Sequence, residues 1–209
     1  MVPGLVSLTR PLHMVSSGSF HTVAVTIDGD VYTWGEGESG RLGTGTEETQ
    51  VSPVKIELPR PVKMVSAGRH HSAAVTVDGD LYAWGDNDSG QLGIDSTFQL
   101  YPVRIITPQP VRIVTTASNY TLVLTVNDKV YAWGDGSCGQ LGTPVPYIRY
   151  EPKLVPLPDK VRMVAAGGSH SVALMNNDRI YIWGYIEFRK TYPTLIEVES
   201  LSMKPQKPN

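Results

Sequence analysis

The fold of this protein is decided by residues 71–85, which read His-Ser-Ala-Ala-Val-Thr-Val-Asp-Gly-Asp-Leu-Tyr-Ala-Trp-Gly. Two runs rich in apolar and β-branched residues flank the pair Asp78-Gly79. An Asp-Gly pair in this setting is the strongest short-range signal for a β-hairpin, and it favours a turn whose two central residues both have positive φ. The stretch therefore predicts two antiparallel strands, at 71–77 and 81–84.

The same pattern occurs four times along the chain. Tryptophans, each followed by glycine, lie 50, 49 and 50 residues apart at Trp34, Trp84, Trp133 and Trp183. Thirteen residues before them stand His21, His71, Tyr120 and His170, and three residues further back stand Gly18, Gly68, Ala117 and Gly167. A proline precedes the latter set by fifteen residues each time, at Pro3, Pro53, Pro102 and Pro152. We interpret these as structural repeat positions, with the tryptophans in the core and each histidine hydrogen-bonded within its own unit.

Each unit predicts four short strands. In the second unit, 53–58 is an outer strand that opens with Pro53, 62–67 is the next strand, and the hairpin supplies the other two. Helical periodicity is absent, so we expect an all-β fold, a β-propeller of four-stranded antiparallel blades with about four repeats. The repeats occupy 1–200, in units of about 3–52, 53–101, 102–151 and 152–198, and a polar tail at 201–209 is expected to be disordered.

Three motifs carry a family resemblance. They are Ser-Ala-Gly-Arg-His-His-Ser at 66–72, Asp-Gly-Asp-Leu-Tyr-Ala-Trp-Gly at 78–85 and Ser-Gly-Gln-Leu-Gly at 89–93. Together they resemble the regulator-of-chromosome-condensation repeat family, over about residues 3 to 198. The resemblance implies one propeller blade for each unit, in a family whose rings usually have seven blades.

The fourth unit departs from this pattern. It reads Tyr-Ile-Glu-Phe-Arg-Lys at 185–190, where the first three units have their x-Gly-x-Leu-Gly loop. Four units leave three explanations for ring closure: a smaller closed ring, completion by a dimer or another partner, or a piece or isoform of a longer protein. The last two are favoured, because an open arc exposes apolar flanks and strand edges to self-association.

Composition excludes several classes of protein. Hydrophobic residues make up 41% and charged residues 18%, which is ordinary for a globular protein, and the net charge is −2. We therefore expect no direct binding of nucleic acid, and no apolar run approaches the ~18 residues of a membrane-spanning helix. The single cysteine, Cys138, cannot form an internal disulfide, which fits the cytoplasm or alternatively the nucleus.

The motifs that resemble catalytic or cofactor sites are better explained as parts of the repeat. The segments 35–40 and 134–139 match Gly-x-Gly-x-x-Gly, but a turn follows instead of a helix, so a dinucleotide site is not expected. The three repeat histidines occupy one equivalent position, where Tyr120 stands in the third unit, which argues against a metal site. Cys138 replaces a repeat serine and has no histidine nearby in sequence. We expect no catalytic residue, no cofactor and no metal.

Binding residues are sought where the repeat varies. The two residues between the repeat glycine position and the repeat histidine position differ in every unit, and in family members that recognise proteins such loops line one face of the ring. By this resemblance the candidate contacts are Phe20, Arg69, His70 and Asn119.

Two functions are compatible with these features. The first is a protein-interaction or regulatory module, part or isoform of a larger scaffold or regulatory protein. The alternative, implied by the founding member of the family, is guanine-nucleotide exchange on a Ran-type small GTPase. That member inserts a β-wedge between strands, and repeat spacings of 50, 49 and 50 leave no room for such an insertion.

Overall fold

The computed structural model describes residues 6, 8, 10–143, 147–186 and 189–198. These residues form four antiparallel sheets of four strands each, which confirms the prediction of propeller blades. The polar tail at 201–209 lies outside the described residues. In the described part of the chain, no helix has the length and apolar character needed to cross a membrane.

The four sheets follow one another along the chain, and the strand order within each equals the chain order. Sheet 1 contains β1 (Leu12–Ser17), β2 (His21–Thr26), β3 (Val31–Gly35) and β4 (Gln50–Ile56). Sheet 2 contains β5 (Val62–Ala67), β6 (His71–Thr76), β7 (Leu81–Asp86) and β8 (Phe98–Ile105). Sheet 3 contains β9 (Val111–Thr116), β10 (Tyr120–Thr125), β11 (Val130–Asp135) and β12 (Ile148–Leu154). Sheet 4 contains β13 (Val161–Ala166), β14 (His170–Met175), β15 (Ile180–Ile186) and β16 (Arg189–Val198). A short 3₁₀ helix, η1 (Glu38–Gly40), lies between β3 and β4.

The sequence unit and the sheet differ in phase by one strand. The strand that contains Pro53 was expected to open the second unit, but it is β4, which pairs with β3 of sheet 1. It begins at Gln50, so Pro53 lies inside the strand and not at its start. Pro102 and Pro152 have the same place in β8 and β12. A proline is tolerated there because each of these strands is the edge of its sheet, where a backbone N–H has no partner strand.

The hairpin turns also differ in detail from the expectation. Only the second residue of each central pair has positive φ: Gly79 at 89°, Gly29 at 87°, Asp128 at 62° and Asp178 at 63°. In the second unit the N–H of Thr76 donates to the carbonyl of Asp80, and the N–H of Gly79 donates to Thr76. The connection is therefore one residue longer than a two-residue turn, and it needs a single left-handed residue.

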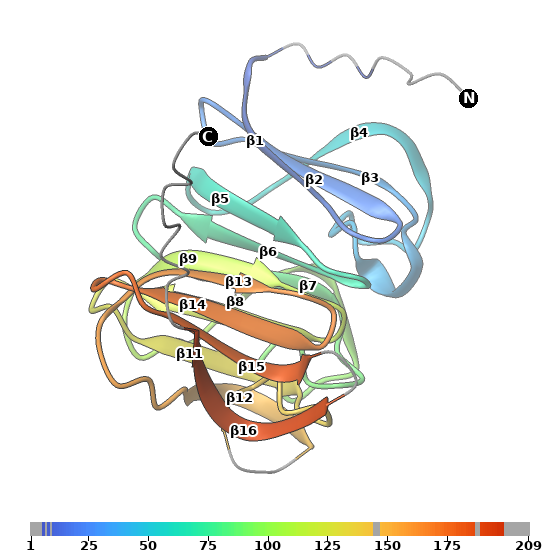
Figure 1. Cartoon of the computed structure of the whole chain (residues 1–209). Coiled ribbons are helices and arrows are strands. Elements are labelled where there is room, and N and C mark those ends of the chain that lie inside the picture. Colours follow the sequence, from blue (N-terminus) through green and yellow to red (C-terminus); the bar gives the residue numbers. More distant parts are fainter. Residues whose placement is uncertain (1–5, 7, 9, 144–146, 187–188, 199–209) are drawn as a thin grey trace, which may run out of the picture.

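Successive sheets pack face to face around an open arc (Figure 1). The first strands of the sheets, β1, β5, β9 and β13, contact one another in order and lie nearest the axis. Three apolar cores fill the spaces between neighbouring sheets. Trp84, Trp133 and Trp183 are fully buried in these cores, whereas Trp34 is only partly buried. Each core therefore belongs to a pair of sheets, and among the described residues the outer flanks of sheets 1 and 4 face no further sheet.

Candidate functional site

The candidate binding residues all lie on one face of the arc. The β1–β2 loops and the long β3–β4 loops emerge at the same end of the sheets, because β2 starts where β3 ends and the two pair antiparallel. Backbone hydrogen bonds join the two kinds of loop: the carbonyl of Phe20 accepts from the N–H of Glu36, and that of His70 from Asp86. The equivalent carbonyl of Asn119 accepts from Asp135. We call this surface the loop face.

Phe20 and His70 form a pair across sheets 1 and 2 on the loop face. Their ring centroids are 6.1 Å apart with the planes tilted by 31°. The guanidinium of Arg41 lies beside the pair, 5.8 Å from the centre of the Phe20 ring, a cation–π distance. Phe20 remains 48% exposed, and burial together with the positive charges of Arg41 and Arg69 lowers the pKa of His70. A half-exposed aromatic ring is thus held in place by its neighbours.

Arg69 lies closer to the axis than this pair. The β1–β2 loops of all four sheets line a polar concavity of about 320 Å³, and Arg69 is the one charged residue among the described residues of its wall. Its backbone N–H donates to the carbonyl of Ala117 in the next sheet, 3.0 Å away. Asn119 is half-buried and does not line the concavity. The structure therefore brings Phe20 and His70 together, sets Arg69 inward of them, and leaves Asn119 apart.

His21 and His71 join neighbouring sheets, so the expectation that each repeat histidine bonds within its own unit is wrong. The Nε2 atom of His21 lies 2.7 Å from Ser72 Oγ, and that of His71 lies 3.0 Å from Thr121 Oγ1. Tyr120 fills the same role in sheet 3, where Ser171 Oγ lies 3.1 Å from its hydroxyl. Burial, with the nearby charges of Arg41 and His70, lowers the pKa of His21 to about 4. Burial likewise lowers the pKa of His71 to about 3.

The repeat glycines make room for these rings. A Cβ on Gly68 would lie 2.7 Å from His71 Cε1 and 2.4 Å from the carbonyl oxygen of Ala117. Gly18 is confined in the same way by His21 and by the carbonyl of Gly68. Gly167 packs against His170, although His170 itself is exposed at the open end of the arc. The glycine and histidine positions of the repeat thus form one packing unit.

Sequence reasoning missed two groups in this region. The hydroxyl residue that follows the repeat histidine position in every unit, Thr22, Ser72, Thr121 and Ser171, was a visible signal. The second group is the ion pair of Arg41 with Glu36, whose Nη1 and Oε2 atoms lie 3.5 Å apart. At the equivalent positions the next two units have hydrogen-bonded pairs, Gln91 with Asp86 and Gln140 with Asp135. Arg41 is buried despite its charge, because Glu38 also accepts from its Nη2 at 2.8 Å.

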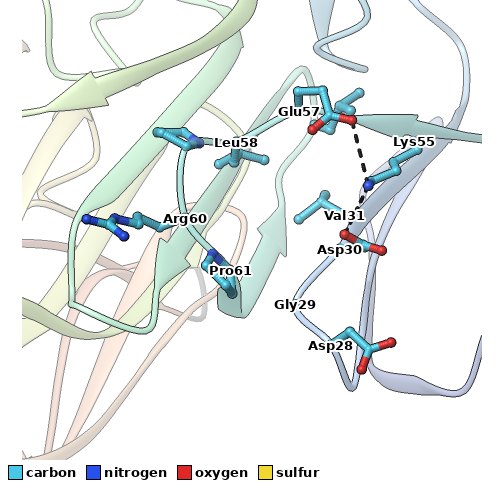
Figure 2. Close-up of a pocket in the computed structure, with 11 residues that line it drawn as sticks. Asp28, Gly29, Asp30, Val31, Lys55, Glu57, Leu58, Arg60 and Pro61 are labelled. Atoms are coloured by element: carbon cyan, nitrogen blue, oxygen red, sulfur yellow. Dashed lines mark ion pairs between the residues drawn. The ribbon is translucent and has the colours of Figure 1, made fainter.

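The opposite face carries a pocket of about 200 Å³ beside the turn of sheet 1 (Figure 2). Lys55 Nζ lies between Asp30, at 3.1 Å, and Glu57, at 3.7 Å. A similar pocket of about 180 Å³ recurs beside the turn of sheet 2, where Arg104 pairs with Asp80. Since the pocket repeats with the blade, it is a consequence of how the turn packs on the segment between sheets.

Groups that could hold a metal are absent from the described residues, where no three His, Cys, Asp or Glu side chains come together. Cys138 is half-buried in the β11–β12 loop, and its backbone N–H donates to Gln140 Oε1. This bond matches that of the equivalent Ser89 to Gln91. The cysteine thus occupies a repeated turn.

Comparison with known proteins agrees with this architecture. The RCC1-like domain family matches residues 2–202. The chain is 43% identical over 49 residues to the human E3 ubiquitin-protein ligase HERC2, which covers 23% of this chain and 1% of HERC2. It is 49% identical over 43 residues to the Xenopus laevis regulator of chromosome condensation, which covers 21% of this chain and 10% of that protein.

Among solved structures, the chain is similar to Prp20p from Saccharomyces cerevisiae, with a TM-score of 0.83 and 23% identity. The match covers 95% of this chain and 52% of Prp20p, so the chain spans about half of that protein and a tenth or less of the two curated relatives. The structural likeness shows the shared propeller fold, and the family match extends over nearly the whole sequence. The chain therefore belongs to the RCC1-like domain family.

Proposed function

We propose that this chain is a protein-interaction module that binds its partner through the loop face, with Phe20, His70 and Arg69 as the main contacts. The observation that carries the proposal is the half-exposed Phe20 ring held between His70 and Arg41. A large aromatic side chain that is already ordered loses little conformational entropy on binding, and aromatic and arginine side chains are favoured anchors of protein interfaces. Asn119, half-buried and set apart, is a peripheral contact.

The concavity next to this pair supports a protein or peptide partner. Apart from Arg69, the described residues that line it are Gly, Ala, Ser and Thr. The serine hydroxyls of such a wall can exchange hydrogen bonds with a polypeptide, and the guanidinium of Arg69 can bind a carboxylate. The partner chemistry that fits best is a protein segment with an apolar side chain for Phe20 and an acidic residue for Arg69.

The alternative function is guanine-nucleotide exchange on a Ran-type small GTPase. It is favoured by the similarity to Prp20p, whose structure is described together with its binding to Gsp1p and histones. Against it, the loops between sheets keep the repeat spacing and contain no inserted hairpin among the described residues. Exchange therefore ranks second, and localisation in the nucleus would accompany it.

The test is affinity capture with the whole chain and three variants. Phe20→Ala, and Arg69→Ala combined with His70→Ala, remove the proposed contacts, while Arg60→Ala removes an exposed charge beside the pocket of the opposite face. Partners identified by mass spectrometry should bind at least about tenfold more weakly to the first two variants and equally to the third, since an anchor residue contributes about 2 kcal/mol or more. Equal loss in all three variants, or in none, would contradict the proposal.

Capture with and without EDTA separates the two functions. Chelation of magnesium removes nucleotide from a small GTPase, and an exchange factor binds the nucleotide-free state. A GTPase captured only with EDTA, together with accelerated release of labelled GDP, would establish exchange as the function. Partners captured regardless of EDTA would support the interaction module.

A further inference from the structure

The three junctions between sheets share one arrangement of hydrogen bonds. A backbone carbonyl in the β3–β4 type loop of one sheet accepts two hydrogen bonds from the next sheet. The carbonyls of Arg41, Gln91 and Gln140 accept from the indole Nε1 of Trp84, Trp133 and Trp183, at 3.0, 2.9 and 2.8 Å. The same carbonyls accept from the hydroxyls of Ser72, Thr121 and Ser171, each at 2.8 Å.

The loop also fits the shape of the indole. The glycine two residues after each carbonyl, Gly43, Gly93 or Gly142, lies so close to the ring that an added Cβ would fall within 2.8–2.9 Å of it. The leucine between them is buried at every junction. A junction therefore has two halves: an x-Leu-Gly loop on one sheet, and a tryptophan with a hydroxyl residue on the next.

Sheet 1 has a tryptophan and a hydroxyl residue in the positions used at a junction, but among the described residues no x-Leu-Gly loop packs against them. Trp34 and Thr22 hold the positions of Trp84 and Ser72, one repeat earlier in the sequence. Trp34 is only partly buried, and among the described residues no hydrogen bond joins its Nε1 atom or the Thr22 hydroxyl to a partner. Val15, equivalent to the fully buried Val65, is 57% exposed.

These residues share one face of sheet 1. Cross-strand pairing places Val15 opposite Ala24 and Ala24 opposite Tyr32, and it places Thr22 opposite Trp34. The equivalent residues of sheet 2, among them Val65, Tyr82 and Trp84, pack against sheet 1 in a buried core. Of the five residues named on sheet 1, only the small Ala24 is fully buried. We call the surface formed by Val15, Thr22, Tyr32 and Trp34 the sheet 1 flank.

A second copy of this chain lacks the matching half. Its three x-Leu-Gly loops already hold Trp84, Trp133 and Trp183. Its fourth unit, whose outer face is open with His170 exposed and Met163 56% exposed, has no such loop in its sequence. Sheet 4 of another copy could offer His170 to Thr22, but no loop carbonyl to Trp34.

We propose that the sheet 1 flank is the docking surface for one further blade of the same repeat type, which this chain does not contain. That blade carries an x-Leu-Gly loop, whose carbonyl accepts from Trp34 Nε1 and from the Thr22 hydroxyl. Its second strand begins with a histidine or tyrosine that reaches Thr22, as His21 reaches Ser72. This inference stands independently of the function proposed for the loop face.

The experiment supplies such a blade to the whole chain. A copy of residues 12–50 is fused in front of Met1. Residues 1–11 then follow this copy in the same way that residues 51–61 follow residues 12–50 of the natural chain, and Pro3 takes the place of Pro53. The tryptophans are labelled with ¹⁵N, and the exchange of each indole N–H with solvent is measured. Trp34→Phe identifies the signal of Trp34.

The unmodified chain should show three slowly exchanging indoles and one fast one, Trp34. In the fusion, Trp34 should exchange more slowly by roughly tenfold or more, because its N–H becomes hydrogen-bonded in a closed junction. The indole of the added copy should then be the fast one. Fast exchange of Trp34 in the fusion, whatever the state of the added blade, would overturn the proposal.

Two controls test the geometry and the competing occupant. Gly43→Val in the added copy alone should restore fast exchange of Trp34, because the side chain enters the space of the indole; continued protection would contradict the proposed seat. Sedimentation of the unmodified chain tests the second copy. A dimer in which the Trp34 N–H is protected would also overturn the proposal.

Discussion

His21 Nε2 lies 2.7 Å from Ser72 Oγ, across the junction between sheets 1 and 2. With the carbonyl of Arg41, the two side chains form a row of three hydrogen-bonding groups. Since the Ser72 hydroxyl donates to the carbonyl of Arg41, it accepts from His21, which must carry its proton on Nε2. The Nδ1 atom is then an acceptor, and it is buried beside Gly18 with no hydrogen-bond partner among the described residues. The histidine is therefore held neutral, in one tautomer, by the neighbouring sheet.

Removal of the Ser72 hydroxyl should destabilise the fold. Ser72→Ala leaves His21 Nε2 buried without an acceptor, which typically costs about 1–3 kcal/mol. Ser72→Thr keeps the hydroxyl, as Thr121 does at the next junction, and should retain most of the stability. Urea unfolding measures both free energies.

Thr22→Ala is the matched control, because Thr22 has the same place in sheet 1, on the flank that no other sheet covers among the described residues. The free energy of unfolding should change by less than about 0.5 kcal/mol. Equal losses for Ser72→Ala and Thr22→Ala would show that the inter-sheet contact is not the cause.

The fold should lose stability as the pH falls from about 6.5 to 4. Burial lowers the pKa of His21 to about 4 and that of His71 to about 3 in the folded state, against about 6.5 when unfolded. As the pH falls, the histidines of the unfolded chain therefore take up protons before those of the folded chain. The stability that the two neutral histidines contribute is fully present above pH 6.5 and declines as the pH falls from about 6.5 to 4. Within this range the free energy of unfolding falls by up to about 1.4 kcal/mol per pH unit for each buried histidine.

Urea unfolding at several pH values between 7.5 and 4.5 measures this slope. His71→Gln lowers the overall stability, but it should also flatten the slope by about one histidine's share, because one proton uptake site is removed. An unchanged slope in this variant would contradict the assignment of the pH dependence to His71.

Gly68 should not tolerate a side chain, whereas Gly168 should. Gly68→Ala places a methyl group 2.4 Å from the Ala117 carbonyl oxygen and 2.7 Å from the His71 ring. Overpacking of this kind typically costs about 1–3 kcal/mol. At Gly168, in the equivalent loop of sheet 4, the nearest atom is Ser118 Oγ at 3.6 Å, an ordinary contact. Thermal unfolding of the two variants should give clearly different midpoints.

Arg41 and Glu36 should be exchangeable as a pair for the Gln and Asp of the next two units. Arg41→Met removes the bond from Nε to the Glu38 carbonyl and both carboxylate contacts, a loss of roughly 1–2 kcal/mol. The double variant Arg41→Gln, Glu36→Asp recreates the Gln91–Asp86 contact of 2.7 Å and should recover most of the thermal midpoint. No recovery would show that the two positions are not coupled.

The candidate binding residues were chosen from the sequence one by one, and their mutual arrangement was not predictable. Phe20 and His70 stand 50 residues apart, and they meet because successive sheets place equivalent loops side by side. Arg41 was missed because it replaces a repeat glutamine in a loop, and its position beside Phe20 depends on how that loop folds back over sheet 1. The positions that vary between repeats thus indicated which loops lie on the loop face, but not the contacts that Phe20, His70 and Arg41 make there.

The sequence alone determined the repeat, the hairpins and the number of strands in each sheet, because turn residues and strand alternation act locally. The tertiary structure decided which strands share a sheet. A tandem repeat has the same pattern wherever the unit is cut, so only pairing in space shows that the strand of Pro53 belongs to sheet 1. It also decided the different burial of Trp34 and Trp84, although both occupy the same repeat position. A tryptophan at this position is buried by the preceding sheet, and in the described part of the chain no sheet precedes sheet 1.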